Sequence, residues 1–212
     1  MQALMTLILV PLIILNLAGW LVSGIWLAML GEWSVIGVGI FYMVASPLAL
    51  SLALMPGLIF AAPGAALMDR GHFFFGGLIA LPSLVWTYLV LGASCVLVVA
   101  YTTAAWDGRP MLPYVLWAYA VAVTPWSFLA QKDAQAGQNE AGWPLFFAQL
   151  ATVAMGVATL FYQGPMYWMD LVVWCAPFMG VGLLLQLIMV VGAAIEERRM
   201  TPLERMMRSV RD

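Results

Sequence analysis

The sequence predicts an all-α fold: a polytopic integral membrane helix bundle of about six transmembrane helices, followed by a short amphipathic helix at the C-terminus. Composition is the first reason. Of 212 residues, 65% are apolar and only 8% are charged, and the mean hydropathy is +0.99. A soluble domain carries about 25% charged residues. This chain has too few charges to cover a water-facing surface, so we expect its surface to face lipid.

The apolar runs are the second reason. A helix rises 1.5 Å per residue, so about 20 residues cross the roughly 30 Å of hydrocarbon in a bilayer. We expect helices over residues 3–30, 33–55, 75–105, 112–129, 143–162 and 171–195. Residues 1–195 would then form one membrane domain, and residues 196–212 a basic, amphipathic tail.

The second apolar run, residues 33–68, is too long for one crossing and too short for two. Two Pro-Gly pairs, Pro56-Gly57 and Pro63-Gly64, lie near its end. Proline removes a backbone donor and breaks or kinks a helix interior. We therefore expect the helix to end near Met55, and residues 56–68 to form a short broken segment, either interfacial or re-entrant.

The distribution of basic residues predicts the orientation. With six crossings, Arg70, Lys132 and the arginines after residue 197 lie on one side, and Arg109 alone lies on the other. Lysine and arginine concentrate in cytoplasmic loops. The sequence therefore predicts a multi-pass protein of a bacterial inner membrane, with both termini in the cytoplasm.

Counting residues excludes several kinds of catalytic and cofactor site. His72 is the only histidine, so a haem held by two histidines cannot form. Lys132 is the only lysine, and we expect it in a loop, where it cannot hold a retinal inside the bundle. Ser94 follows His72 by 22 residues on nearly one helix, which places them about 33 Å apart, too far for a serine and its base. We expect no cofactor, no metal and no catalytic residue.

Uncharged polar residues occur inside the predicted helices, among them Asn16, Gln149 and Gln186. Hydrogen bonds between neighbouring helices, worth about 0.6 kcal/mol each, are their commonest role. A pore or a binding cavity is the alternative.

Charged residues gather on the predicted cytoplasmic face, and they form the candidate functional surface. Its members are Asp69, Arg70, His72, Lys132, Asp133 and Glu140. Together they could bind an anionic lipid headgroup or a partner protein. The simpler alternative is that charged residues cluster wherever the chain meets water.

Two further features predict contacts. Ala148, Thr152 and Gly156 follow one another at four-residue steps, a pattern of small residues that allows two helix backbones to approach, within the chain or between subunits. The tail has the periodicity of an amphipathic helix. Its apolar stripe and its adjacent arginines are Leu203, Arg205, Met206, Met207, Arg208, Val210 and Arg211. Anionic membrane lipids and a partner protein are both possible ligands of this helix, and a disordered tail is the alternative.

These observations favour a non-enzymatic accessory or scaffold subunit of a larger membrane complex. Its partners would be membrane lipids and other membrane-protein subunits or further copies of itself, with no nucleic acid. A small transporter or channel for a neutral or lipid-like solute is the alternative, because broken backbone at membrane depth lies beside protein or a water-filled cavity. An enzyme that acts on lipid headgroups at His72 is the third hypothesis.

Overall fold

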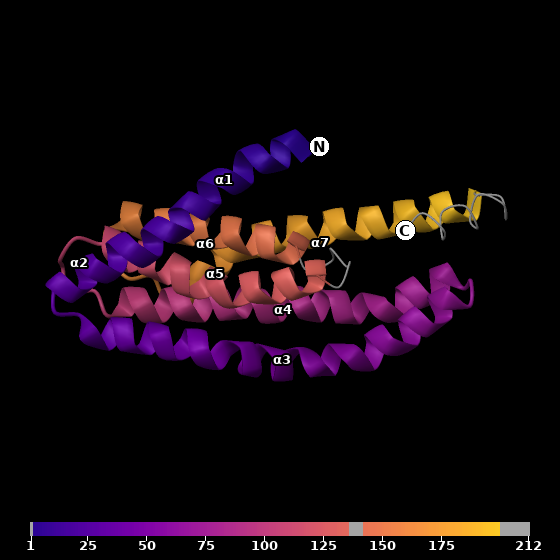
Figure 1. Cartoon of the computed structure of the whole chain (residues 1–212), viewed down its shortest axis with the longest axis horizontal. Helices are drawn as coiled ribbons and strands as arrows, with labels where there is room; N and C mark the ends of the chain where they lie inside the picture. The colour runs from indigo at the N-terminus through magenta and orange to yellow at the C-terminus, as the bar shows by residue number, and fades with distance from the viewer. Residues whose placement is uncertain (1, 136–141, 200–212) are drawn as a thin grey trace.

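The computed structural model describes residues 2–135 and 142–199, and every regular element in these ranges is helical. The elements are α1 (Gln2–Ala18), the π-helical segment η1 (Gly19–Ser23), α2 (Gly24–Met29), α3 (Trp33–Asp69), α4 (Phe73–Ala104), α5 (Leu112–Gln135), α6 (Gly142–Tyr162) and α7 (Trp168–Arg199). They run back and forth along one axis, with α1, η1 and α2 as a single continuous rod (Figure 1). The expected all-α helix bundle is confirmed.

Five segments are long and apolar enough to cross a membrane. They are Val10–Met29, Trp33–Met68, Phe74–Ala104, Gly142–Tyr162 and Trp168–Gly192. The protein is therefore a multi-pass membrane protein. In the chain, α5 follows α4 and precedes α6. It runs in the same direction as α3 and α7 (Figure 1).

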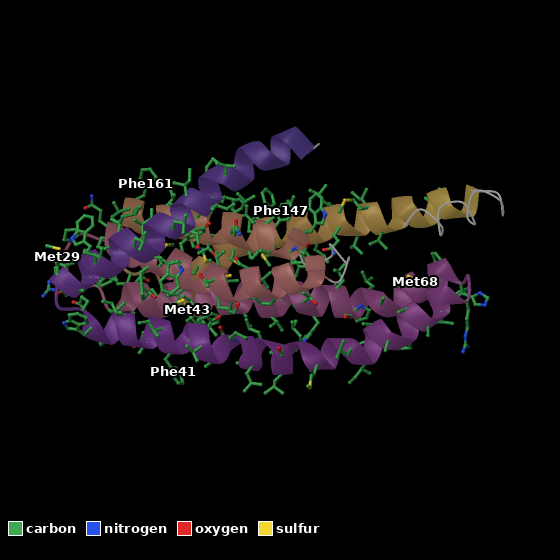
Figure 2. All side chains as sticks on the ribbon, in the orientation of Figure 1. Met29, Phe41, Met43, Met68, Phe147 and Phe161 are labelled. Carbon is green, nitrogen blue, oxygen red and sulfur yellow. The ribbon has the colours of Figure 1, made fainter. Side chains whose placement is uncertain are left out.

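The centre of the bundle is α5. From Pro113 to Trp126 every side chain is buried except Leu116 and Thr124, which are half-buried. The helices α3, α4, α6 and the N-terminal rod all contact α5. The remaining helices carry the lipid-facing side chains, such as Phe41, which points away from the bundle on the outside of α3 (Figure 2).

The expected broken segment at residues 56–68 is wrong, because α3 continues as one helix to Asp69. Pro47, Pro56 and Pro63 all lie inside it. Each proline leaves one carbonyl without its helical donor. Near Pro47 the Ser46 hydroxyl donates to the freed Met43 carbonyl at 3.4 Å, one way in which membrane helices tolerate proline.

The glycines that follow the prolines let α3 and α4 pack closely. A Cβ added at Gly64 would lie 2.8 Å from the Gly76 carbonyl oxygen, and one at Gly57 would lie 3.1 Å from Ser83 Oγ. The two Pro-Gly pairs are therefore part of a tight antiparallel hairpin. Its connecting turn needs Gly71, whose φ is +84°.

Other ends of helices also differ from the expected ones. The helix α5 extends to Gln135, so Lys132 lies in a helix and the expected loop position is wrong. The helix α7 begins at Trp168 and reaches Arg199, so the first residues of the expected tail continue it. The expected amphipathic helix after residue 200 lies outside the described residues.

Candidate functional site

Hydrogen bonds attach the N-terminal rod to the central helix. Tyr119 of α5 donates its hydroxyl proton to the Leu12 carbonyl at 3.1 Å, and the Trp20 indole donates to Thr124 Oγ1 at 2.9 Å. Gly19, the residue before Trp20, lies so close to α5 that an added Cβ would be 2.6 Å from the Leu116 carbonyl oxygen. A π-helical turn often marks a functional position, but here η1 fits α1 closely against α5.

The Trp117 side chain of α5 lies between the N-terminal rod and α3. Its indole Nε1 donates to the Val35 carbonyl at 3.2 Å, and its ring meets Trp20 edge-on with centroids 5.3 Å apart. Gly24 and Gly39 leave the space for the indole, because a Cβ at Gly39 would lie 2.5 Å from Nε1. This one aromatic side chain therefore connects α5 with the N-terminal rod and with α3.

A polar cluster joins α5 to α4 deeper in the bundle. The Trp126 indole donates to Ser94 Oγ at 3.3 Å, and Ser94 in turn donates to the Leu91 carbonyl at 2.8 Å. Cys95 is buried beside them. Because the two helices are antiparallel and rise equally, the Trp126–Ser94 contact fixes which residues of α4 and α5 share a level.

The buried face of α6 packs against α5. Ala148, Thr152 and Gly156 are all buried, and a Cβ at Gly156 would lie 2.5 Å from Val115 Cγ1. The structure therefore places this face in contact with a helix of the same chain.

The helices α4 and α7 meet through a hydrogen bond and an apolar groove. Tyr88 donates its hydroxyl proton to Gln186 Oε1 at 2.8 Å, and both side chains are buried. Beside this pair lies a groove of about 370 Å³, lined by apolar side chains of both helices and open to the outside. Gln186 is one of the polar residues predicted to bond between helices.

The Arg109 end of the bundle is closed by ion pairs. Arg109 contacts Glu32 at 3.4 Å and Asp107 at 3.0 Å, and it also donates to the Leu30 carbonyl. The loop after α4 is thus tied to the turn before α3. Asp170 lies at the same end, in a cavity of about 400 Å³ beside the α6–α7 turn.

The predicted functional surface is divided between two helix ends. Asp69 ends α3, and Arg70 and His72 are exposed in the turn after it. Lys132 and Asp133 lie near the end of α5, which stops well short of that turn (Figure 1). Glu140 lies outside the described residues, as do the tail residues from Leu203 to Arg211.

The register of the helices gives the separation of these two groups. Lys132 follows Trp126 by six residues, so it lies level with the residue six before Ser94, which is Tyr88. Phe73, the first residue of α4, lies fifteen residues before Tyr88, and Arg70 lies just beyond Phe73. At 1.5 Å per residue the two levels are about 22 Å apart. We call them the α5 level (Lys132 and Asp133) and the tip level (Arg70).

The helix α7 reaches past the α5 level as well. Arg198 follows Gln186, the partner of Tyr88, by twelve residues and therefore lies about 18 Å beyond the α5 level. The interval between the levels is apolar. Neither residues 56–68 of α3 nor residues 73–84 of α4 include a charged residue, and the same holds for residues 188–195 of α7. We call these three stretches the overhang.

The overhang exposes large apolar side chains on α3, α4 and α7. The most exposed are Met55 at its edge, Leu58, Ile59, Phe74, Phe75, Leu78, Ile188 and Val191. The sequence does not predict the overhang, because the apolar runs give the lengths of the helices but not their register. One feature of the sequence indicates it: the second apolar run is longer than a single membrane crossing by a dozen residues or more.

Three buried polar atoms in the described part of the chain have no hydrogen-bond partner: Asn16 Nδ2, Tyr42 Oη and Tyr114 Oη. They lie on three different helices, α1, α3 and α5. Among the described residues no group of three or more histidine, cysteine or acidic side chains is placed to hold a metal ion.

Comparisons of this chain with models of protein families, with curated proteins and with solved structures find no match.

Proposed function

We propose that this chain is a non-enzymatic accessory or scaffold subunit of a larger membrane complex in a bacterial inner membrane, with the tip level in the cytoplasm. One observation supports the proposal more than any other: the apolar overhang lies between two charged levels. Only one of these levels can coincide with the boundary of the bilayer.

Suppose that the boundary lies at the α5 level. The overhang then leaves the membrane and exposes its apolar side chains to water, including Ile59 and Phe74. Exposed apolar patches of this kind mark protein–protein or membrane contacts. A partner protein would have to cover the overhang in this arrangement.

Suppose instead that the boundary lies at the tip level. Lys132 and Asp133 then lie about 22 Å inside the membrane. Inserting one such residue at the centre of a helix costs about 2.5–3.5 kcal/mol, and these residues usually face protein or a water-filled cavity. A partner that covers the end of α5 would supply the polar environment.

Tilting the bundle does not bring the α5 level and the tip level to the same boundary of the bilayer. The helix α4 has 32 residues and is about 48 Å long. A tilt of about 40°, the upper end of the usual range, still leaves about 37 Å to fit into roughly 30 Å of hydrocarbon. The same tilt shortens the separation of the two levels along the membrane normal only from about 22 Å to about 17 Å.

A partner subunit with its own transmembrane helices resolves both cases. Its apolar helices would lie along the overhang, and its polar groups would meet the end of α5. The packed centre of the bundle agrees with a scaffold, because α5 fills the axis with buried side chains such as Tyr114 and Trp117.

Purification of the tagged full chain from its native membrane in mild detergent tests the proposal. We expect a companion membrane protein in a fixed molar ratio, which is lost when the overhang carries charge, as in Ile59→Lys. The matched control is Trp33→Lys, at a similarly exposed position at the other end of the same helix, where charged residues already occur. A chain that purifies alone and stays folded would contradict the proposal.

A small transporter for a neutral or lipid-like solute is the second candidate. The position of the α5 level favours it, because water between the overhanging helices could also solvate Lys132. Leu84 of α4 packs against the core near this level, whereas Leu89 is exposed on the outside. With Cys95 and Cys175 replaced by serine, a water-soluble maleimide should label Leu84→Cys but not Leu89→Cys if the water-filled space exists.

A further inference from the structure

The groove between α4 and α7 has a floor, two walls and a lateral opening. Its floor is buried and includes Tyr88, Gly92, Cys175 and Met179. Exposed side chains form the rims, among them Leu97 on α4. The groove therefore opens sideways to the surroundings of the bundle, which for a membrane-spanning helix pair is lipid.

Small residues give the groove its depth. Gly92 and Ala93 on α4 and Ala176 on α7 all line it. A Cβ at Gly92 would meet Met179 and Cys175 only at ordinary contact distances of 3.5 and 3.6 Å. Glycine at this position therefore leaves free space in the groove and is not required by close contact between the helices.

The length of the groove matches one leaflet. On α7 it extends from Trp168, in the first turn of the helix, to Met179, which is about 17 Å along the axis. Half of the roughly 30 Å of hydrocarbon is about 15 Å. Trp168 lies at the Arg109 end, and tryptophan prefers the headgroup level. The groove thus runs from a membrane surface to about the middle of the bilayer.

The size and the lining of the groove favour a hydrocarbon chain as its occupant. Its volume of about 370 Å³ lies at the lower end of the range for small-molecule sites. Its lining is apolar, and the one buried hydroxyl in it, that of Tyr88, is already bonded to Gln186. The buried floor of the groove therefore offers no free hydroxyl to a headgroup or a polar solute, and the groove suits a single hydrocarbon chain.

We propose that this groove is a binding site for one acyl chain of a membrane phospholipid from the leaflet at the Arg109 end. The chain lies along Gly92, Ala93 and Ala176 and ends near Met179. The site lies on another part of the bundle than the overhang, so its occupancy does not depend on a partner subunit.

Native mass spectrometry of the full chain, purified from membranes of known phospholipid composition, tests the site. Wild-type protein should retain one phospholipid after detergent washing. Ala93→Phe and Ala176→Phe fill the groove from opposite walls, and each should lose this lipid. Ala49→Phe is the control, because Ala49 is an exposed alanine on α3 that does not line the groove. Equal retention in all four proteins, or no retention by the wild type, overturns the proposal.

A photo-crosslinking residue identifies the occupant directly. Leu97 lines the groove and is exposed, so p-benzoylphenylalanine at this position should add the mass of a phospholipid on irradiation. The measurement needs only one substitution at a rim and does not depend on the filled variants. A protein adduct at Leu97 would show that the groove receives a helix of another chain, which overturns the acyl-chain proposal while leaving the scaffold proposal intact.

Discussion

Gly64 of α3 and Gly76 of α4 hold two helix backbones against each other: a Cβ added at Gly76 would lie 2.6 Å from the Gly64 carbonyl oxygen. This contact lies inside the overhang, beyond the last residue of α5. The hairpin therefore keeps its shape through its own packing where the central helix no longer supports it. Close approach of small residues is a common source of stability between membrane helices.

We predict that Gly76→Leu forces the tip of the hairpin apart. Overpacking typically costs about 1–3 kcal/mol, so the variant should unfold at lower temperature in detergent. Gly77→Leu is the matched control, because a Cβ at Gly77 meets no atom within 4 Å. Equal unfolding temperatures of the two variants would contradict a close contact between α3 and α4 at Gly76.

A second prediction concerns the α5–α6 contact. Gly156→Leu should destabilise the fold by about 1–3 kcal/mol, because Val115 Cγ1 lies 2.5 Å from the position of the new Cβ. Adding Val115→Ala should recover part of this loss. Gly180→Leu on α7 serves as the control, since the space beside Gly180 is open. An oligomer that dissociates while each subunit stays fully stable would argue instead for a contact between subunits.

The contacts of Trp117 with α3 and the N-terminal rod give a third prediction. Gly39→Ala places a methyl group 2.5 Å from the indole Nε1, so the ring has to move and its bond to the Val35 carbonyl is lost. A hydrogen bond of this kind contributes about 0.5–1.5 kcal/mol, and the steric conflict adds to the loss. Gly37→Ala, two residues earlier in an open position, should have little effect. Thermal unfolding of the two variants makes the comparison.

The orientation of the bundle is the fourth prediction. A reporter enzyme fused after Gly71 should stay in the cytoplasm, and one fused after Gly108 should be exported, because Arg109 is the only basic residue expected on the outside. Reporter activity in whole cells measures both. Export of the Gly71 fusion would reverse the topology and place the tip level outside.

Much of the fold could be predicted from the apolar runs, because a run of about 20 residues without charge is nearly sufficient to predict a membrane helix. The central position of α5 could not. A helix that is buried on all sides has no apolar stripe to reveal its neighbours, and only its contacts, such as Trp117 with Val35, identify it as the centre.

The candidate site was harder to predict, for two physical reasons. Proline predicts a break in soluble helices, yet α3 continues through Pro56 and Pro63. Membrane helices tolerate proline because neighbouring helices and side chains can satisfy the freed backbone groups. The register between helices depends on contacts such as Trp126 with Ser94, and no local pattern encodes it. For this reason the sequence predicts Arg70 and Lys132 on one surface, whereas the structure places them at levels about 22 Å apart.

Photo-crosslinking in the native membrane tests the central claim, that a partner subunit covers the overhang. Phe74 in the overhang and Phe41 outside it are 65% and 73% exposed, so p-benzoylphenylalanine at the two positions samples equally open surroundings with little change in shape. We predict one discrete protein adduct from position 74 and lipid adducts alone from position 41. Lipid adducts alone from both positions would contradict the scaffold account.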